Sequence, residues 1–73
     1  MRIIISQHAK KRMGDLRQSN IDTGDIIEAA LSIPGYIPAA TRFRGFVSAG
    51  GRTFDIVAKD VFNGRLVITI IGK

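Results

Sequence analysis

The stretch that decides the fold is residues 52–71, RTFDIVAKDVFNGRLVITII. Two runs rich in β-branched and aromatic residues flank the dipeptide Asn63-Gly64, which is typical of a two-residue hairpin turn. With Asn63 and Gly64 at the centre of the turn, Phe62 pairs with Arg65. The sequence therefore predicts an antiparallel β-hairpin whose strands cover 52–62 and 65–71.

This register divides the hairpin side chains between two faces of a sheet, with Lys59 opposite Ile68 and Ala58 opposite Thr69. The first face suits a core covered by helices, because its charges fall at the strand ends. The second carries Asp55 and Lys59 among apolar residues, so we expect the first strand, a loop or a second copy of the chain to cover it. The predicted core face holds Phe54, Ile56, Ala58, Phe62, Val67, Thr69 and Ile71, and the other face holds Asp55, Val57, Lys59, Val61, Leu66, Ile68 and Ile70.

Four further elements are expected before the hairpin. A β-branched run at the start predicts a short strand, and Ser6 can cap a helix in which Ala9, Met13 and Leu16 share an apolar stripe. Asp22 marks the start of a second helix. The expected bounds are 2–5 for the strand, 7–17 and 22–31 for the helices, and 43–48 for a strand before the hairpin.

These elements predict one α+β domain over residues 1–73, in which two N-terminal helices pack against one antiparallel sheet made of the short N-terminal strand and three C-terminal strands. Seventy-three residues leave no room for a doubly wound nucleotide-binding fold or a barrel. The chain has no cysteine, and its six acidic residues show no metal-ligand spacing. We therefore expect neither a disulfide nor a metal cofactor.

Eleven Lys and Arg against six Asp and Glu give the chain a net charge of +5. The resulting potential favours a polyanionic partner, either nucleic acid or an acidic protein, although the charge can also serve solubility alone. The apolar run at the N-terminus is shorter than a signal-peptide core, and no stretch approaches the ~20 apolar residues of a membrane span. We therefore expect a cytoplasmic protein that does not enter membranes.

His8 and Arg12 lie one helical turn apart, on one shoulder of the first predicted helix. A neutral imidazole near a helix N-terminus can accept a proton, and a guanidinium beside it can hold a phosphate. This pair is a candidate acid–base site. The alternative interpretation is structural: His8 packs over the first strand as a core residue, and Arg12 pairs with Asp15 on the helix surface.

A second candidate site lies around the third strand segment. Arg42 and Arg44 alternate on one side of it, with Phe43 opposite, and Arg52 follows the next turn. These guanidinium groups can contact phosphates, and Phe46, two positions beyond Arg44, can stack on a base. The alternative is an edge strand that charge protects from aggregation.

The motif Ser6-Gln7-His8-Ala9, followed by Arg12-Met13, resembles the start of a family of small bacterial domains of unknown function. Members begin with Ser or Thr, continue with His-Ala, two variable residues and Arg-Met, and end in a hairpin like Val67–Ile70 here. That family is similar to the RelE-like and BrnT-like toxins, whose compact domains place two helices beside an antiparallel sheet and cleave RNA. The resemblance spans nearly the whole chain.

The resemblance implies a metal-independent endoribonuclease in which a 2′-hydroxyl attacks the adjacent phosphorus. It implies His8 as an acid or base and Arg12 and Arg52 as groups that stabilise the phosphorane. RNA, an acidic antitoxin protein and a second copy of the chain are the expected partners, and no cofactor is expected. A non-catalytic nucleic-acid-binding or protein-interaction module on the same basic surface is the alternative. The residues expected to bind RNA are Lys11, Arg42, Arg44, Lys59 and Phe46.

Overall fold

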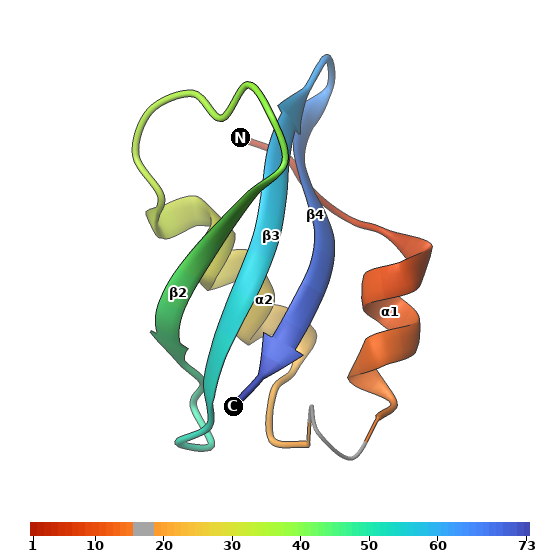
Figure 1. The fold of residues 1–73 in the computed structure, drawn as a ribbon, viewed down its shortest axis with the longest axis vertical. Coiled ribbons are helices and arrows are strands. Elements are labelled where there is room, and N and C mark those ends of the chain that lie inside the picture. The colour runs from red at the N-terminus through yellow and green to blue at the C-terminus, as the bar shows by residue number, and fades with distance from the viewer. Residues whose placement is uncertain (16–18) are drawn as a thin grey trace.

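The computed structural model describes residues 1–15 and 19–73 and confirms an α+β fold, with two helices and a four-stranded sheet (Figure 1). The sheet order is β1-β4-β3-β2. The three long strands are antiparallel, but β1 pairs with β4 in parallel, so the expectation of a wholly antiparallel sheet is wrong at this edge. The elements are β1 (Ile3–Ile5), α1 (Gln7–Met13), α2 (Thr23–Ser32), β2 (Thr41–Val47), β3 (Thr53–Val61) and β4 (Gly64–Gly72).

Both helices begin at the caps that the sequence predicts. The Ser6 side chain accepts a hydrogen bond from the Ala9 amide, and Asp22 forms a reciprocal capping box with Asp25. However, α1 ends at Met13, four residues earlier than predicted. Gly14 is its C-cap, and Leu16 and Arg17, which were expected within the helix, lie outside the described residues.

α2 crosses one face of the sheet and α1 lies beside β4 (Figure 1). The face under α2 is the core, and neither described helix lies over the opposite face of the three long strands. Among the described helices, none combines the length and apolar character that a bilayer crossing requires. The core cluster consists of Ile21, Ile26, Ala29, Ala30, Ile37, Phe54, Ile56, Ala58, Val67 and Ile70.

The hairpin itself is confirmed, but its predicted turn is wrong. Val61 pairs with Gly64, so Phe62 and Asn63 form the turn and Gly64 begins β4. The reason is the parallel neighbour: a Cβ atom at Gly64 would overlap the Arg2 carbonyl oxygen, and Gly64 has φ +153°. The glycine thus permits close approach of β1 instead of a tight turn.

A bulge in β4 then changes which side chains face the core. Ala58 pairs with Val67 but Val57 pairs with Thr69, so Ile68 is the extra residue. As a result Ile70 is buried in the core, whereas the predicted register put Thr69 and Ile71 there. The bulge coincides with Ser6, whose amide and hydroxyl donate to the Val67 and Ile68 carbonyls at 3.0 and 2.6 Å.

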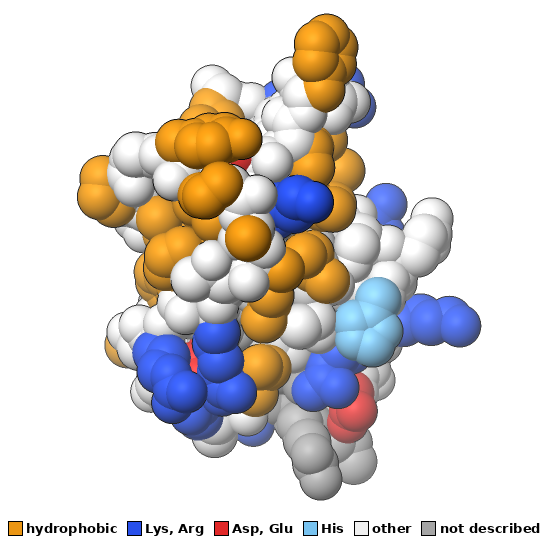
Figure 2. All heavy atoms as spheres, turned by 45° about the horizontal axis from the view of Figure 1, so that its top comes forward, with side chains coloured by type: hydrophobic (Ala, Val, Ile, Leu, Met, Phe, Trp, Pro, Cys, Tyr) orange, Lys and Arg blue, Asp and Glu red, His pale blue; other side chains and the backbone are white. Residues whose placement is uncertain are grey.

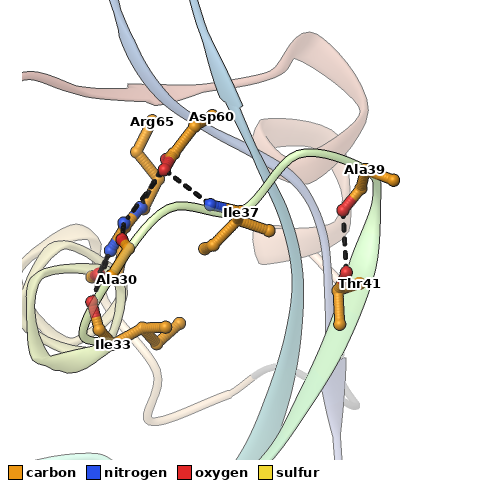
Figure 3. A network of polar contacts seen from close by, with 8 residues as sticks. Ala30, Ile33, Ile37, Ala39, Thr41, Asp60 and Arg65 are labelled. Carbon is orange, nitrogen blue, oxygen red and sulfur yellow. Dashed lines mark hydrogen bonds and ion pairs between the residues drawn. The ribbon is translucent and has the colours of Figure 1, made fainter.

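A buried arginine joins the sheet to the end of α2 (Figure 3). The side chain of Arg65 is 1% exposed and forms an ion pair with Asp60, with Nε 2.7 Å from Oδ1. Its Nη atoms donate to the carbonyls of Ala30, Ile33 and Gly35, each at 2.8 Å. Arg65 therefore provides the C-terminal capping that α2 lacks in its own last turn, which carries no basic residue.

Candidate nucleic-acid interface

The uncovered face of the sheet carries an aliphatic strip. The observed register places Val57 and Val61 of β3 and Leu66 and Ile71 of β4 on the side opposite the core, and all four are half-buried. The expectation that β1 or a loop covers this face is wrong for the described residues, because β1 lies at the sheet edge beyond β4. Coverage by a second copy of the chain stays a prediction.

Basic side chains gather on this face over β2. Arg42 and Arg44 project from β2, as the sequence predicted, and a bulge at Gly45 separates them from the end of the strand. Figure 2 shows a dense group of Lys and Arg side chains here, at the lower left, and a second group with the histidine on the other side of hydrophobic residues. We call Arg42, Arg44, Arg52 and Lys73 the arginine cluster.

Asp55 lies buried at the centre of the arginine cluster. It is 1% exposed, and its Oδ2 accepts hydrogen bonds from Arg42 Nε and Nη2 at 3.0 and 2.8 Å. Lys73 Nζ lies 3.3 Å from the same oxygen, and the Gly45 amide donates to Oδ1 at 3.1 Å. Arg52 is connected through the backbone, because its Nε donates to the Lys73 carbonyl at 2.8 Å. One carboxylate thus allows several like charges to gather.

The same contacts set the pKa of Asp55. Burial raises the pKa of this carboxyl, but the hydrogen bonds from Arg42, from the Gly45 amide and from Lys73 outweigh burial and hold it below its usual value. The pKa of Asp60 is also lowered, first by the Arg65 hydrogen bonds and then by the Ile37 amide. Both carboxylates therefore favour the ionised state in the fold.

We expect the free energy of unfolding to stay level above about pH 5 and to fall as the pH drops below about 4. The pKa values of Asp55 and Asp60 are lower in the folded protein than in the unfolded chain, so the unfolded chain binds more protons as the pH falls. Urea unfolding at several pH values measures this. The free energy of unfolding of Asp55→Asn should fall less steeply as the pH drops. A wild-type unfolding midpoint that does not change down to about pH 3 would contradict the prediction.

α1 presents the other predicted site beside the edge of β4. His8 is exposed and its imidazole makes no hydrogen bond to another described residue, so the alternative of a core histidine is wrong. Arg12 is half-buried, and its Nε donates to the Ile70 carbonyl at 2.9 Å, on the stretch of β4 beyond β1. Lys11 is exposed on the same helix. Arg12 therefore protects an open sheet edge as well as lying one turn from His8.

The structure does not join all the predicted catalytic residues through contacts. Arg12 donates to the Ile70 carbonyl, whereas Arg52 donates to the Lys73 carbonyl and to Ser19 Oγ at 3.4 Å. His8 and Arg12 share α1, and Arg52 belongs to the arginine cluster. The aliphatic strip belongs to β3 and β4, which lie between β2 and α1. Figure 2 shows hydrophobic side chains between the two basic groups.

Phe46 does not lie beside the two arginines as predicted. The bulge at Gly45 turns it to the core face, where its ring packs 5.7 Å from that of Phe54. There it lines a cavity of about 170 Å³ next to Glu28 of α2. Lys59, in contrast, is exposed on the uncovered face as its strand position predicted.

Sequence reasoning missed Lys73 as a member of the arginine cluster. The signal was Asp55, an acidic residue within an apolar strand, because a buried carboxylate needs cationic or hydrogen-bonding partners. Its partners come from positions 42, 45 and 73, which only the strand pairing brings together. The spacing along the chain gave no indication of this set.

Comparisons with protein-family models, with curated proteins and with solved structures found no match to this chain. The resemblance to RelE-like toxins therefore stays a prediction.

Proposed function

We propose that this protein binds RNA across the uncovered face of its sheet. The observation that carries the proposal is the placement of basic groups on both sides of the aliphatic strip (Figure 2). Backbone phosphates supply most of the affinity of nucleic acids for proteins, and guanidinium forks match their geometry. An acidic protein would meet the same cations and would compete with RNA.

Arg44 and Lys59 are the cations on this face best placed for phosphate. Both are exposed, and the structure gives neither side chain a partner among the described residues. Arg42, by contrast, is engaged with Asp55. A phosphate at Arg44 or Lys59 replaces only water, whereas one at Arg42 must compete with a carboxylate. Arg44 and Lys59 therefore account for the first phosphate contacts.

Arg44→Gln should weaken RNA binding severalfold and reduce the slope of log affinity against log salt by about one. The matched control is Lys10→Gln, which removes the same charge two positions beyond His8, on the opposite side of α1. Fluorescence anisotropy with labelled RNA over a salt series gives both quantities. Equal effects of the two variants, or no binding by the wild type at low salt, would contradict the proposal.

A second candidate function is RNA cleavage, favoured by the exposed His8 one turn from Arg12. In that reaction the 2′-oxygen attacks phosphorus, its proton leaves to a base, and the bond to the 5′-oxygen breaks as that oxygen gains a proton. His8 would move one of these protons. Arg12 and Arg52 would stabilise the negative charge of the phosphorane.

His8→Ala should lower cleavage about 100-fold or more, the usual contribution of an acid or base. The experiment incubates total RNA with wild type, His8→Ala and Arg12→Ala in the presence of a chelator. Gln7→Ala, at the neighbouring exposed position of α1, is the control. RNA that stays intact with folded wild type excludes this function and leaves RNA binding in place, and equal cleavage by His8→Ala excludes His8 as the acid or base.

A further inference from the structure

Two aromatic side chains stand in solvent at one end of the sheet. Phe62 occupies the tip of the β3–β4 turn and is fully exposed, and Tyr36 is 75% exposed in the connection between α2 and β2. Figure 1 shows that connection and the turn at the same end of the molecule. We call Tyr36 and Phe62 the aromatic end. Neither ring contributes to the core.

Polar contacts hold the backbone on both sides of Tyr36. Ile37 and Asp60 are joined twice: the Ile37 amide donates to Asp60 Oδ2, and the Asp60 amide donates to the Ile37 carbonyl, both at 2.8 Å. On the other side, Arg65 Nη2 donates to the Gly35 carbonyl at 2.8 Å. Since Asp60 is two residues before Phe62, the same network fixes both the connection that carries Tyr36 and the strand that leads to Phe62. The aromatic end is thus presented on an ordered support.

The charges near this end favour a polyanion. Lys59 is exposed on the uncovered face, three residues before Phe62, and the exposed Arg2 contacts Arg65 through its backbone carbonyl at the base of the turn. The nearby acid, Asp60, is paired with Arg65. An aromatic ring beside unpaired cations is the combination that binds single-stranded nucleic acid, because every base has a face that stacks and every linkage carries a negative charge.

We propose that the aromatic end stacks unpaired bases of single-stranded RNA whose phosphates continue along Lys59 towards the arginine cluster. This proposal rests on the RNA binding proposed above and names its substrate class. From Phe62 to Asp55 the strand covers about 23 Å, so a short oligonucleotide spans both regions. A duplex keeps its bases paired and stacked, so it loses the contact with the rings and keeps the contact with the cations.

The probes are a labelled decauridine RNA, an abasic strand of the same length and a blunt RNA duplex. Wild type should bind decauridine about tenfold more tightly than the abasic strand. Phe62→Ala and Tyr36→Ala should each remove most of that preference and leave affinity for the abasic strand unchanged. Phe62→Trp should keep the preference, since stacking survives. Leu31→Ala, which truncates an exposed apolar residue of α2, is the matched control.

Tyr36 also provides a direct signal, because the chain has one tyrosine and no tryptophan. Its fluorescence should be quenched by decauridine and not by the abasic strand. Wild type that binds all three probes equally, with no effect of Phe62→Ala, overturns this inference and leaves RNA binding intact. Wild type that binds no RNA overturns both proposals, and retention on anionic vesicles in that case would assign the aromatic end to a membrane surface.

Discussion

Arg65→Met should cost this domain about 3 to 5 kcal/mol of its free energy of unfolding. A chain of this length has roughly 4 to 11 kcal/mol in total, so the variant is expected to be unfolded or close to its unfolding midpoint in water. Methionine matches the length and flexibility of the arginine stem, so the loss comes from polar contacts and not from an unfilled cavity.

Five hydrogen bonds explain the size of this effect. All five N–H donors of the guanidinium form hydrogen bonds. Two are donated to Asp60, and three are donated to the carbonyls of Ala30, Ile33 and Gly35. Methionine leaves a largely buried carboxylate without its cation and leaves the end of α2 without its cap. Each group then loses its partner while water stays excluded.

Urea unfolding followed by circular dichroism measures the change. Arg44→Met, the same substitution at an exposed position, should leave the midpoint unchanged. The unfolding midpoint of Arg65→Lys should fall between those of Arg65→Met and wild type, because an ammonium keeps the charge but not the planar, two-pronged donor geometry of the guanidinium. A double variant, Asp60→Leu with Arg65→Met, separates two explanations. We expect it to remain unstable, because three carbonyls stay uncapped; recovery of stability would show that only the ion pair mattered.

Arg65 also shows where sequence reasoning reaches its limit. Local signals act over three or four residues, and they correctly predicted the Ser6 cap and the Asp22 capping box. Arg65, in contrast, caps a helix that ends more than thirty residues earlier. In the amino-acid sequence, Arg65 looks like any charged residue at the end of a strand. Its role depends on where β4 passes α2, which no local pattern encodes.

Phe62, predicted on the core face, is instead exposed in the turn, and the other two errors in side-chain placement share one cause. A bulge at Gly45 moved Phe46 to the core face, and a bulge at Ile68 moved Ile70 there. Alternation predicts faces only while the ladder is regular, and one inserted residue reverses every later assignment. Before each bulge the predictions hold: Arg42 lies on the uncovered face and Val67 in the core.

Asp55→Asn should lower stability and raise RNA affinity. Asparagine keeps one acceptor oxygen for Arg42, Lys73 and the Gly45 amide but loses the second oxygen and the negative charge, so we expect a loss of about 2 kcal/mol, less than for a fully buried pair because Arg42 is 37% exposed. The same change frees two cations for phosphate and removes a negative charge from the binding face. We expect RNA to bind about three- to tenfold more tightly at low salt.

The sign follows from comparing two magnitudes. Releasing Arg42 from Asp55 costs ordering, about 0.5 to 1.5 kcal/mol when the side chain is fixed again on RNA. A carboxylate about 4 Å from a bound phosphate repels it by about 1 kcal/mol in water and about 4 kcal/mol near a protein surface. Asp55 is buried in the protein surface, so the larger value applies, and the repulsion that the variant removes exceeds the cost of ordering Arg42 again on RNA.

Glu28→Gln is the matched control for Asp55→Asn. It removes the same unit of negative charge from an exposed position on α2, behind the sheet, so net charge changes equally while the uncovered face does not. Urea unfolding and RNA anisotropy on both variants separate local from global charge. Equal gains in affinity would assign the effect to net charge. Weaker binding by Asp55→Asn would mean instead that Asp55 holds Arg42 and Lys73 in the positions that RNA requires.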